Sequence, residues 1–164
     1  PGGYVAAIRC AQLGMKTAII EKYTNLGGTC LNVGCIPSKA MLDSSEHYFN
    51  AKHNFETHGI STGDLQVNLE KLVARKNEVV SQTCDGVKFL MDKNKIDVYH
   101  GLGSFIDKNN IKVVGKEGEK TIQTDKVIIA TGSKPNFFPG MEPDRRTGLL
   151  GVRPIAFRRC LGRV

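Results

Sequence analysis

The chain has 164 residues and a mass of 17.9 kDa, which matches about one domain and leaves room for a buried core. Its 40% of hydrophobic and 24% of charged residues are typical of a globular fold, and no apolar run of about 18 residues predicts a segment that spans a membrane. Most of the net charge of +7 falls in residues 145–164, which hold six arginines and no acid, so the body of the fold gives no reason to expect nucleic acid as a partner.

The N-terminal residues predict a helix followed by a strand. Apolar residues within 5–13 are spaced as on the buried face of a helix, and Gly14 suits the position that ends it. Residues 17–20 form a short apolar run that closes on the acid Glu21, as is typical of a buried strand. A helix leading into a strand implies a parallel crossover, so we expect the chain to begin inside a β-α-β unit whose first strand is missing.

Two longer helices are predicted in the middle of the chain. The first covers residues 40–52, and residues 53–64 after it carry the turn residues typical of a loop. The second covers residues 65–93, where leucines and valines recur at roughly helical spacing, with an interruption near Gly86. Helices that alternate with strands in this way are typical of the α/β class.

The later residues predict further strands. A small antiparallel meander is expected over residues 96–123, with strands at 96–99, 111–114 and 121–123 and a turn at 115–118. Residues 126–130, with the sequence KVIIA, give the strongest strand prediction in the chain. We therefore expect an α/β fold in which helices flank a parallel sheet and a small antiparallel meander is added.

Cys30 and Cys35 form the most distinctive feature of the sequence, because several glycines frame them. They could be half of a metal site, two unrelated buried thiols, or a redox pair. A zinc site is disfavoured, since zinc ligands usually lie two to four residues apart and are joined by a second pair. Five residues along a regular helix, two Cα atoms lie about 8.7 Å apart, beyond the roughly 7 Å that a disulfide can bridge. The redox interpretation therefore needs a distorted helix, which Gly34 and Pro37 favour, and spacing alone leaves two buried thiols as an open alternative.

The segment GTCLNVGCIPSK, residues 28–39, resembles the redox-active segment of the class I pyridine nucleotide-disulfide oxidoreductases. The resemblance extends from Pro1 to about Asp144, and within the family the sequence is most similar to the branch that oxidises dihydrolipoamide. It implies a Rossmann-like FAD-binding domain over residues 1–144, incomplete at its N-terminus, and leaves 145–164 as an atypical basic segment of doubtful origin. It also implies that Cys30 exchanges with substrate and that Cys35 lies against the flavin.

The same resemblance implies a set of FAD-binding residues. Gly3 would be the third glycine of the family's G-x-G-x-x-G turn, and Glu21 would accept hydrogen bonds from the adenosine ribose, with Lys22 beside it. Lys39 would place a cation close to the flavin ring. The remaining implied contacts come from glycines and hydroxyl residues near the phosphates, the adenine and the end of the last strand: Gly28, Thr29, Gly103, Thr131, Gly132 and Ser133.

The activity that the resemblance implies is oxidation of protein-bound dihydrolipoamide, with electrons passing through Cys30 and Cys35 to FAD and then to NAD⁺. The implied partner is a lipoyl-bearing protein of a 2-oxo acid dehydrogenase or glycine cleavage complex, and the parent protein is expected to be a homodimer whose NAD-binding domain lies outside this chain. Alternatives are an NADPH-dependent relative of the mercuric or glutathione reductase type and a non-catalytic remnant of a flavin domain. Five cysteines without a secretory signal favour a reducing compartment, the bacterial cytoplasm or the mitochondrial matrix.

Overall fold

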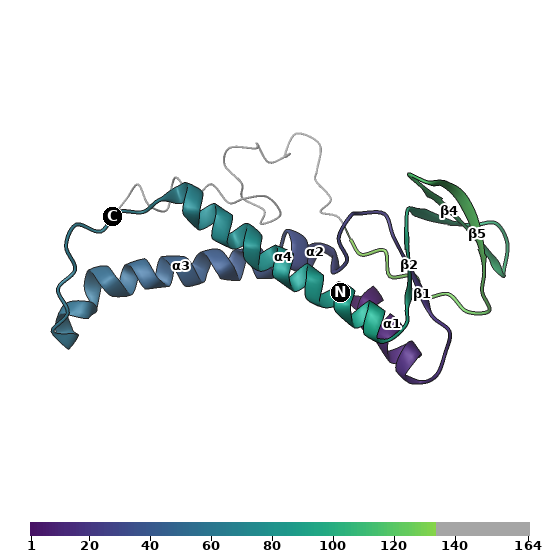
Figure 1. Ribbon diagram of the computed structural model, residues 1–164, viewed down its shortest axis with the longest axis horizontal. Helices are drawn as coiled ribbons and strands as arrows, with labels where there is room; N and C mark the ends of the chain where they lie inside the picture. Colours follow the sequence, from purple (N-terminus) through teal and green to yellow (C-terminus); the bar gives the residue numbers. More distant parts are fainter. Residues whose placement is uncertain (134–164) are drawn as a thin grey trace. The chain divides into compact units, whose positions relative to one another are not determined.

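A computed structural model gives the structure of the protein and describes residues 1–133 (Figure 1). The basic segment predicted at 145–164 lies outside the described residues. The described chain divides into two compact units, one formed by Pro1–Thr29 together with the residues from Cys84 onward and the other by residues 30–83. Each unit is built by a different kind of local structure, so they are taken in turn.

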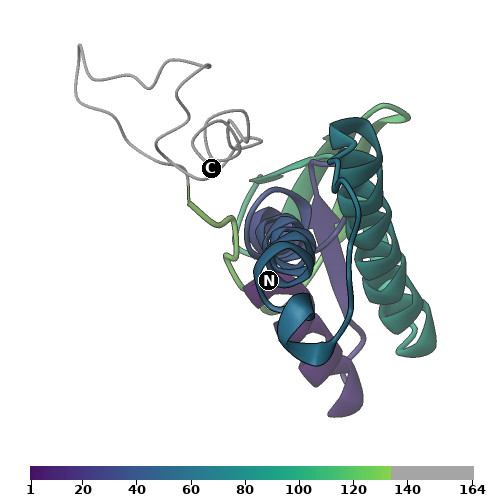
Figure 2. The same ribbon diagram turned by 90° about the vertical axis from the view of Figure 1, so that its left-hand side faces the viewer.

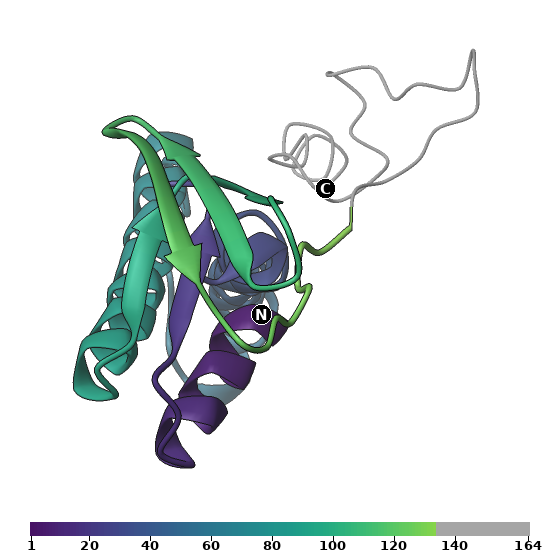
Figure 3. The ribbon, with the colours of Figure 1, turned by 90° about the vertical axis from the view of Figure 1, so that its right-hand side faces the viewer.

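The first unit contains the helix and strand that the sequence predicts at its N-terminus, and the strand pairs in parallel with one from later in the chain. Helix α1 (Gly2–Gln12) is followed by strand β1 (Ala18–Glu21), which pairs in parallel with β2 (Asp97–His100). Gly14 has φ +84° just after the helix and donates its N–H to the carbonyl of Ala11, so the predicted glycine stop is confirmed. Figure 3 shows β1 and β2 side by side. The α/β fold class, with a parallel sheet and an antiparallel sheet, is confirmed.

The antiparallel meander is confirmed, but its boundaries differ from the prediction. It consists of three strands in the order β3 (Leu102–Phe105), β4 (Asn110–Gly115) and β5 (Gly118–Gln123). The strand expected at 96–99 belongs instead to the parallel sheet as β2. Strand β3, where no strand is predicted, is the first strand of the meander (Figure 3). The sequence of β3 shows no alternation of apolar and polar residues, so its strand conformation comes from pairing with β4 rather than from its own pattern.

The core of the first unit is small and formed by side chains from α4, β4 and the chain just before β2. Met91 is fully buried, and Val87 and Ile96 are 5% exposed. In β4, Ile111 and Val113 are buried while Val114 is exposed, which is the alternation of a strand with one face inward. These apolar contacts supply the main stabilisation of the unit.

The strand predicted most strongly, at 126–130, is wrong for the described structure, because no strand is assigned there. Ile128 and Ile129 are 63% and 72% exposed. A strand needs a neighbour to which its backbone can hydrogen-bond, and the strands in residues 1–133 pair only with one another. The apolar run therefore favours a strand, but a strand forms only where a second strand is available for pairing.

The second unit is helical and carries the cysteine pair. Helix α2 (Gly28–Asn32) leads into α3 (Cys35–His53), and the single-turn 3₁₀ helix η1 (Phe55–His58) follows. Figure 2 views α3 nearly end-on, with η1 at its near end and the chain rising from η1 to the start of α4 (Leu69–Lys93). Among the described residues, no helix is both long and apolar enough to cross a membrane.

Helix boundaries in this unit differ from the prediction for local reasons. Helix α3 begins at Cys35 rather than near residue 40, because Pro37 lies in the first turn, where a missing N–H costs no hydrogen bond. Helix α4 begins at Leu69 rather than at 65, where the side chain of Asn68 accepts the N–H of Lys71 as an N-cap. The interruption expected near Gly86 is absent, and α4 continues through that glycine.

Candidate functional site

The cysteine pair lies across a break between two helices. Cys30 is on α2, Cys35 is the first residue of α3, and Gly34 between them has φ −122° and ψ −110°, outside the helical region. The distortion that a disulfide at this spacing requires is therefore present. Both residues are thiols in the structure, with Cys30 half-buried and Cys35 exposed.

The two cysteines contact each other through side chain and backbone. A hydrogen bond from the Cys30 thiol to Cys35 raises the pKa of Cys30, and partial burial and the charge of Cys35 raise it further. The backbone N–H of Cys35 bonds to the Cys30 sulfur and opposes this change, but the net direction is upward. Cys30 therefore keeps its proton to a higher pH than an ordinary cysteine and donates it to Cys35, which gives the contact a direction.

Lys39 lies on α3 four residues after Cys35, a spacing that places two residues on the same side of a helix. Its side chain is exposed.

Glu21 occupies the end of β1, the edge where parallel strands place ligand-binding residues. Its Oε1 accepts the N–H of Tyr23 at 3.0 Å, and its backbone carbonyl accepts the N–H of Gly101 at 2.9 Å. The adjacent Lys22 is exposed and its Nζ lies 4.9 Å from the centre of the Tyr23 ring. A carboxylate held in this way by the backbone can accept hydrogen bonds from ribose hydroxyl groups.

The N-terminus of α1 carries no group that would compete with an anion. Its first turn contains no acidic residue, and Pro1 at the N-cap makes no side-chain hydrogen bond to the helix. A Cβ added to Gly28 would lie 3.1 Å from the backbone nitrogen of Pro1, so the Gly28 backbone packs tightly against the start of this helix. At Gly3 an added Cβ would lie 3.5 Å from the Cβ of Ala130, which is an ordinary van der Waals contact. Together with Glu21, these groups fit FAD as a ligand.

The other residues assigned to FAD are less closely held. Gly103 is on β3 opposite Val113, and a Cβ there would lie 3.3 Å from Cγ2 of Ile20. The residues at 131–133 are exposed, and Gly132 has φ +74°, a conformation that favours glycine. Thr29, at the start of α2, is exposed as well.

Sequence reasoning missed the tightest backbone crossing in the first unit. A Cβ on Gly101 would lie 2.6 Å from the carbonyl oxygen of Val114, and one on Gly115 would overlap the carbonyl oxygen of His100. These two glycines let the end of β2 cross the end of β4 directly beyond Glu21. In the sequence, the two glycines are the only sign of this crossing. They do not stand out, because the chain has 18 glycines.

No group of three or more metal-binding side chains occurs in the part of the chain that the structure describes. Cys84 is buried in α4, where burial raises the pKa of its thiol and the neighbouring Asp85 adds to the effect. Cys10 is half-buried in α1. The cysteines that the structure brings together are therefore Cys30 and Cys35.

Comparison with known proteins agrees with this picture. The chain is 47% identical over 162 residues to a mitochondrial dihydrolipoyl dehydrogenase of Schizosaccharomyces pombe, and the match covers 94% of this chain and 32% of the relative. It is 46% identical over 161 residues to the mitochondrial dihydrolipoyl dehydrogenase of Pisum sativum, with 94% and 32% covered. A leghemoglobin reductase of Glycine max is 46% identical over 161 residues, with 94% and 31% covered. The chain thus spans about a third of the length of the curated relatives it matches.

Solved structures show the same fold. The Cu(II) complex of the HOCl-induced flavoprotein disulfide reductase RclA from Escherichia coli superposes with a TM-score of 0.67 at 27% identity, covering 84% of this chain and 27% of that one. The family model described as pyridine nucleotide-disulphide oxidoreductase matches residues 1–154. The chain, with its parallel β1–β2 pair and its paired cysteines across a helix break, belongs to the pyridine nucleotide-disulphide oxidoreductase family.

Proposed function

We propose that this chain is the FAD-binding and redox-disulfide portion of an enzyme that oxidises the dihydrolipoyl group of a partner protein. The observation that carries the proposal is the contact between Cys30 and Cys35 across the break at Gly34. Dihydrolipoyl dehydrogenases are among its relatives at 42–48% identity. A disulfide between two nearby cysteines can accept the two electrons that a dihydrolipoyl dithiol releases.

The exchange at the cysteines balances as follows. A thiolate of the substrate attacks Sγ of Cys30 in the Cys30–Cys35 disulfide, forming a mixed disulfide and releasing the Cys35 thiolate. The second substrate thiol then loses its proton and attacks the substrate sulfur, which closes the substrate disulfide and releases Cys30. The substrate loses two electrons and two protons, and the pair gains the two electrons.

The asymmetry of the pair agrees with these roles. The raised pKa of Cys30 means that the released Cys30 thiolate takes up a proton and donates it in a hydrogen bond to Cys35. Bound FAD would supply the acceptor of the two electrons and would pass them to NAD⁺ as a hydride. Within the chain, Gly3, Gly28, Thr29 and Glu21 would hold the dinucleotide part of the cofactor, and Lys39 would lie near the ring.

The wider proposals rest on the relatives. The domain that we propose to bind FAD covers residues 1–144, and the lipoyl-bearing partner, the homodimer and the NAD⁺ site belong to the whole enzyme. Several of the relatives are named as mitochondrial, so we propose the mitochondrial matrix or its bacterial equivalent, the cytoplasm, as the location of the protein.

The decisive experiment is to map the disulfide. The oxidised chain, treated with iodoacetamide and digested with trypsin, should yield a peptide 23–39 that is unalkylated and two hydrogens lighter than its dithiol form. Adding dihydrolipoamide should convert that peptide to the doubly alkylated form in stoichiometric amount, and the Cys10→Ser and Cys84→Ser variants should behave in the same way. If iodoacetamide still alkylates Cys30 and Cys35 in the oxidised chain, or if these residues are joined to other cysteines, the proposal is wrong.

Cofactor binding is tested separately by titrating the chain with FAD and following the flavin fluorescence. Glu21→Gln should weaken binding about tenfold, because a carboxylate accepts stronger hydrogen bonds from ribose hydroxyls than an amide does. Glu56→Gln, a change of the same type on η1, is the control and should bind as the unmodified chain does. Equal affinity of all three proteins would contradict the role of Glu21.

A further inference from the structure

Arg75 connects the two long helices of the second unit. From α4, its Nη1 donates to the carbonyl oxygen of Ala40 at 2.9 Å and to Oγ of Ser44 at 3.1 Å. Its Nη2 donates to Oδ2 of Asp43 at 2.6 Å, which is also an ion pair. All three acceptors are on α3, so one planar guanidinium holds one turn of that helix.

This connection is concentrated in one residue. Within residues 30–83, the hydrogen bonds recorded between α3 and α4 all come from Arg75. Asp43 is half-exposed, so the ion pair alone would contribute little, but the bond to Ala40 reaches a residue that is only 7% exposed. Because the acceptor at Ala40 is a main-chain carbonyl of α3, the contact restrains the helix backbone and not only a side chain.

The restrained turn is close to the cysteine pair. Ala40 follows Cys35 by five residues, about 7.5 Å along the helix axis. Gly34, the residue before α3, provides no side-chain cap and has a backbone conformation that does not continue α2. The helix can therefore change its direction at Gly34, and the Arg75 contacts limit that movement.

We propose that Arg75 is a positioning residue for the Cys30–Cys35 couple, an inference that rests on the proposed redox function of that pair. A disulfide forms only within narrow limits of Cα separation and dihedral angle, so its stability depends on how closely α3 is held at the geometry that brings the two sulfurs together. Arg75 holds α3 at that geometry from α4. Its loss leaves the cysteines chemically intact but lowers the effective concentration of one thiol at the other.

The expected effect is on the redox equilibrium. Oxidised glutathione converts the dithiol to the disulfide and is itself reduced to two molecules of glutathione, so the ratio of the two protein forms gives the equilibrium constant. In Arg75→Met this constant should fall by about threefold to tenfold. A tenfold fall makes the potential of the couple about 30 mV less negative, since a tenfold change for two electrons is 29.6 mV.

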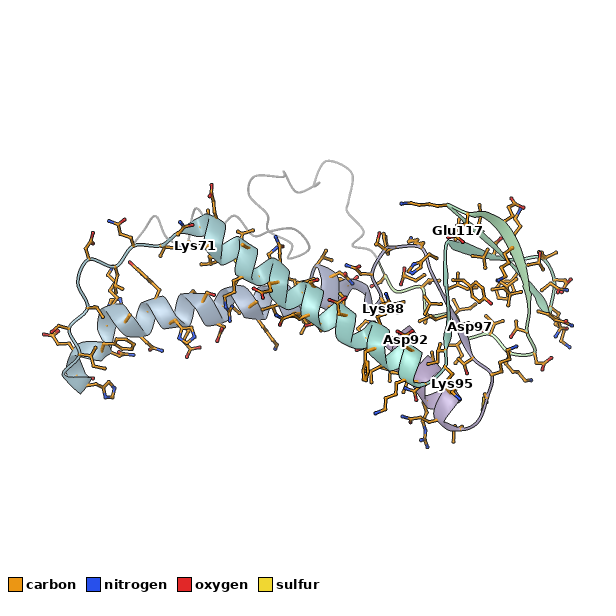
Figure 4. The ribbon with its side chains drawn as sticks, in the orientation of Figure 1. Lys71, Lys88, Asp92, Lys95, Asp97 and Glu117 are labelled. Atoms are coloured by element: carbon orange, nitrogen blue, oxygen red, sulfur yellow. The ribbon has the colours of Figure 1, made fainter. Side chains whose placement is uncertain are left out.

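A matched control comes from the same helix. Lys71 lies one turn before Arg75, near the beginning of α4 (Figure 4), and its side chain is exposed. Lys71→Met removes the same charge from the same helix and should leave the equilibrium constant within a factor of two. Arg75→Lys keeps the charge but cannot make all three bonds from one planar group, so its constant should lie between those of Arg75→Met and the unmodified chain.

The test uses the whole chain in glutathione buffers, with alkylation and mass measurement of peptide 23–39. Arg75→Met with an unchanged constant and unchanged helical circular dichroism would overturn the inference. If that variant loses helix, Asp43→Asn, which weakens one bond and keeps the others, decides instead: an unchanged constant overturns the inference and a fall of about twofold or more supports it. Failure of the unmodified chain to form the Cys30–Cys35 disulfide would overturn the proposed function, whereas normal formation in every variant would overturn only the role of Arg75.

Discussion

The crossing of β2 and β4 gives a sharp test of the fold beside Glu21. In Gly101→Ala the new Cβ would lie 2.6 Å from the carbonyl oxygen of Val114, 2.8 Å from its carbonyl carbon and 2.9 Å from Cγ1 of Val113. Two of these atoms belong to the backbone, so a change of side-chain rotamer cannot relieve the overlap. To reach an ordinary contact of about 3.4 Å, the two chain segments must separate by roughly 0.8 Å.

The cost follows from the rigidity of the crossing. Val113 is 4% exposed and β4 is paired on both sides, with β3 and with β5, so a shift of this size disturbs two ladders. Overpacking in a well-packed region costs about 1–3 kcal/mol, and a backbone overlap belongs at the upper end. We expect about 3 kcal/mol, which lowers the folding equilibrium constant by roughly two orders of magnitude.

Urea unfolding followed by circular dichroism measures this change. The control is Gly63→Ala, where an added Cβ meets nothing within 4 Å, so its stability should stay the same or rise by about 0.5 kcal/mol. The N–H of Gly101 bonds to the carbonyl of Glu21, so the destabilised variant should also bind FAD more weakly at a given urea concentration. A free energy of unfolding for Gly101→Ala within 0.5 kcal/mol of the control would refute the close crossing.

Three further predictions concern a helix cap and two titrating groups. Asn68→Ala removes the N-cap of α4 and should lower the free energy of unfolding by about 1 kcal/mol, as read from urea curves. The side-chain amide of Asn110 lowers the pKa of Asp107, so the ionised carboxylate stabilises the fold above its ordinary pKa, and this stabilisation is lost as the pH falls through the lowered value. Asp107→Asn should therefore reduce the loss of stability between pH 7 and pH 2. An unchanged pH profile would contradict this prediction. In Cys35→Ala, the hydrogen bond that raises the pKa of Cys30 is absent, so alkylation of peptide 23–39 by iodoacetamide should begin at a lower pH than alkylation of Cys30 in the reduced unmodified chain; a midpoint that stays or rises would contradict the asymmetry of the pair.

The features that could be predicted from the sequence are those that depend on nearby residues. Gly14 ends α1 because its positive φ depends only on its own backbone, and the short apolar run before Glu21 forms β1. The features that could not be predicted depend on partners far along the chain. Strand β3 exists through its pairing with β4, whereas residues 126–130 have a strong strand pattern and no pairing strand among the described residues.

The candidate site shows the same division. The spacing of the cysteines indicated that a disulfide needs a distorted helix, and the break at Gly34 provides one. The hydrogen bond that distinguishes Cys30 from Cys35 depends on how α2 and α3 meet, which no residue pattern specifies. Arg75 was not recognisable either, because its acceptors lie 31–35 residues earlier in the sequence.

The break between the helices also explains how two chemically identical thiols can differ in role. If α2 continued into α3, Cys35 would lie within a helix with its N–H bonded to a carbonyl four residues earlier. Because α3 starts afresh at Cys35, that N–H is released from the helix ladder and reaches the Cys30 sulfur, while the Cys30 thiol donates to Cys35. The direction of proton and electron movement in the proposed exchange is thus set within six residues of the backbone, and the longer-range contacts act by keeping that geometry in place.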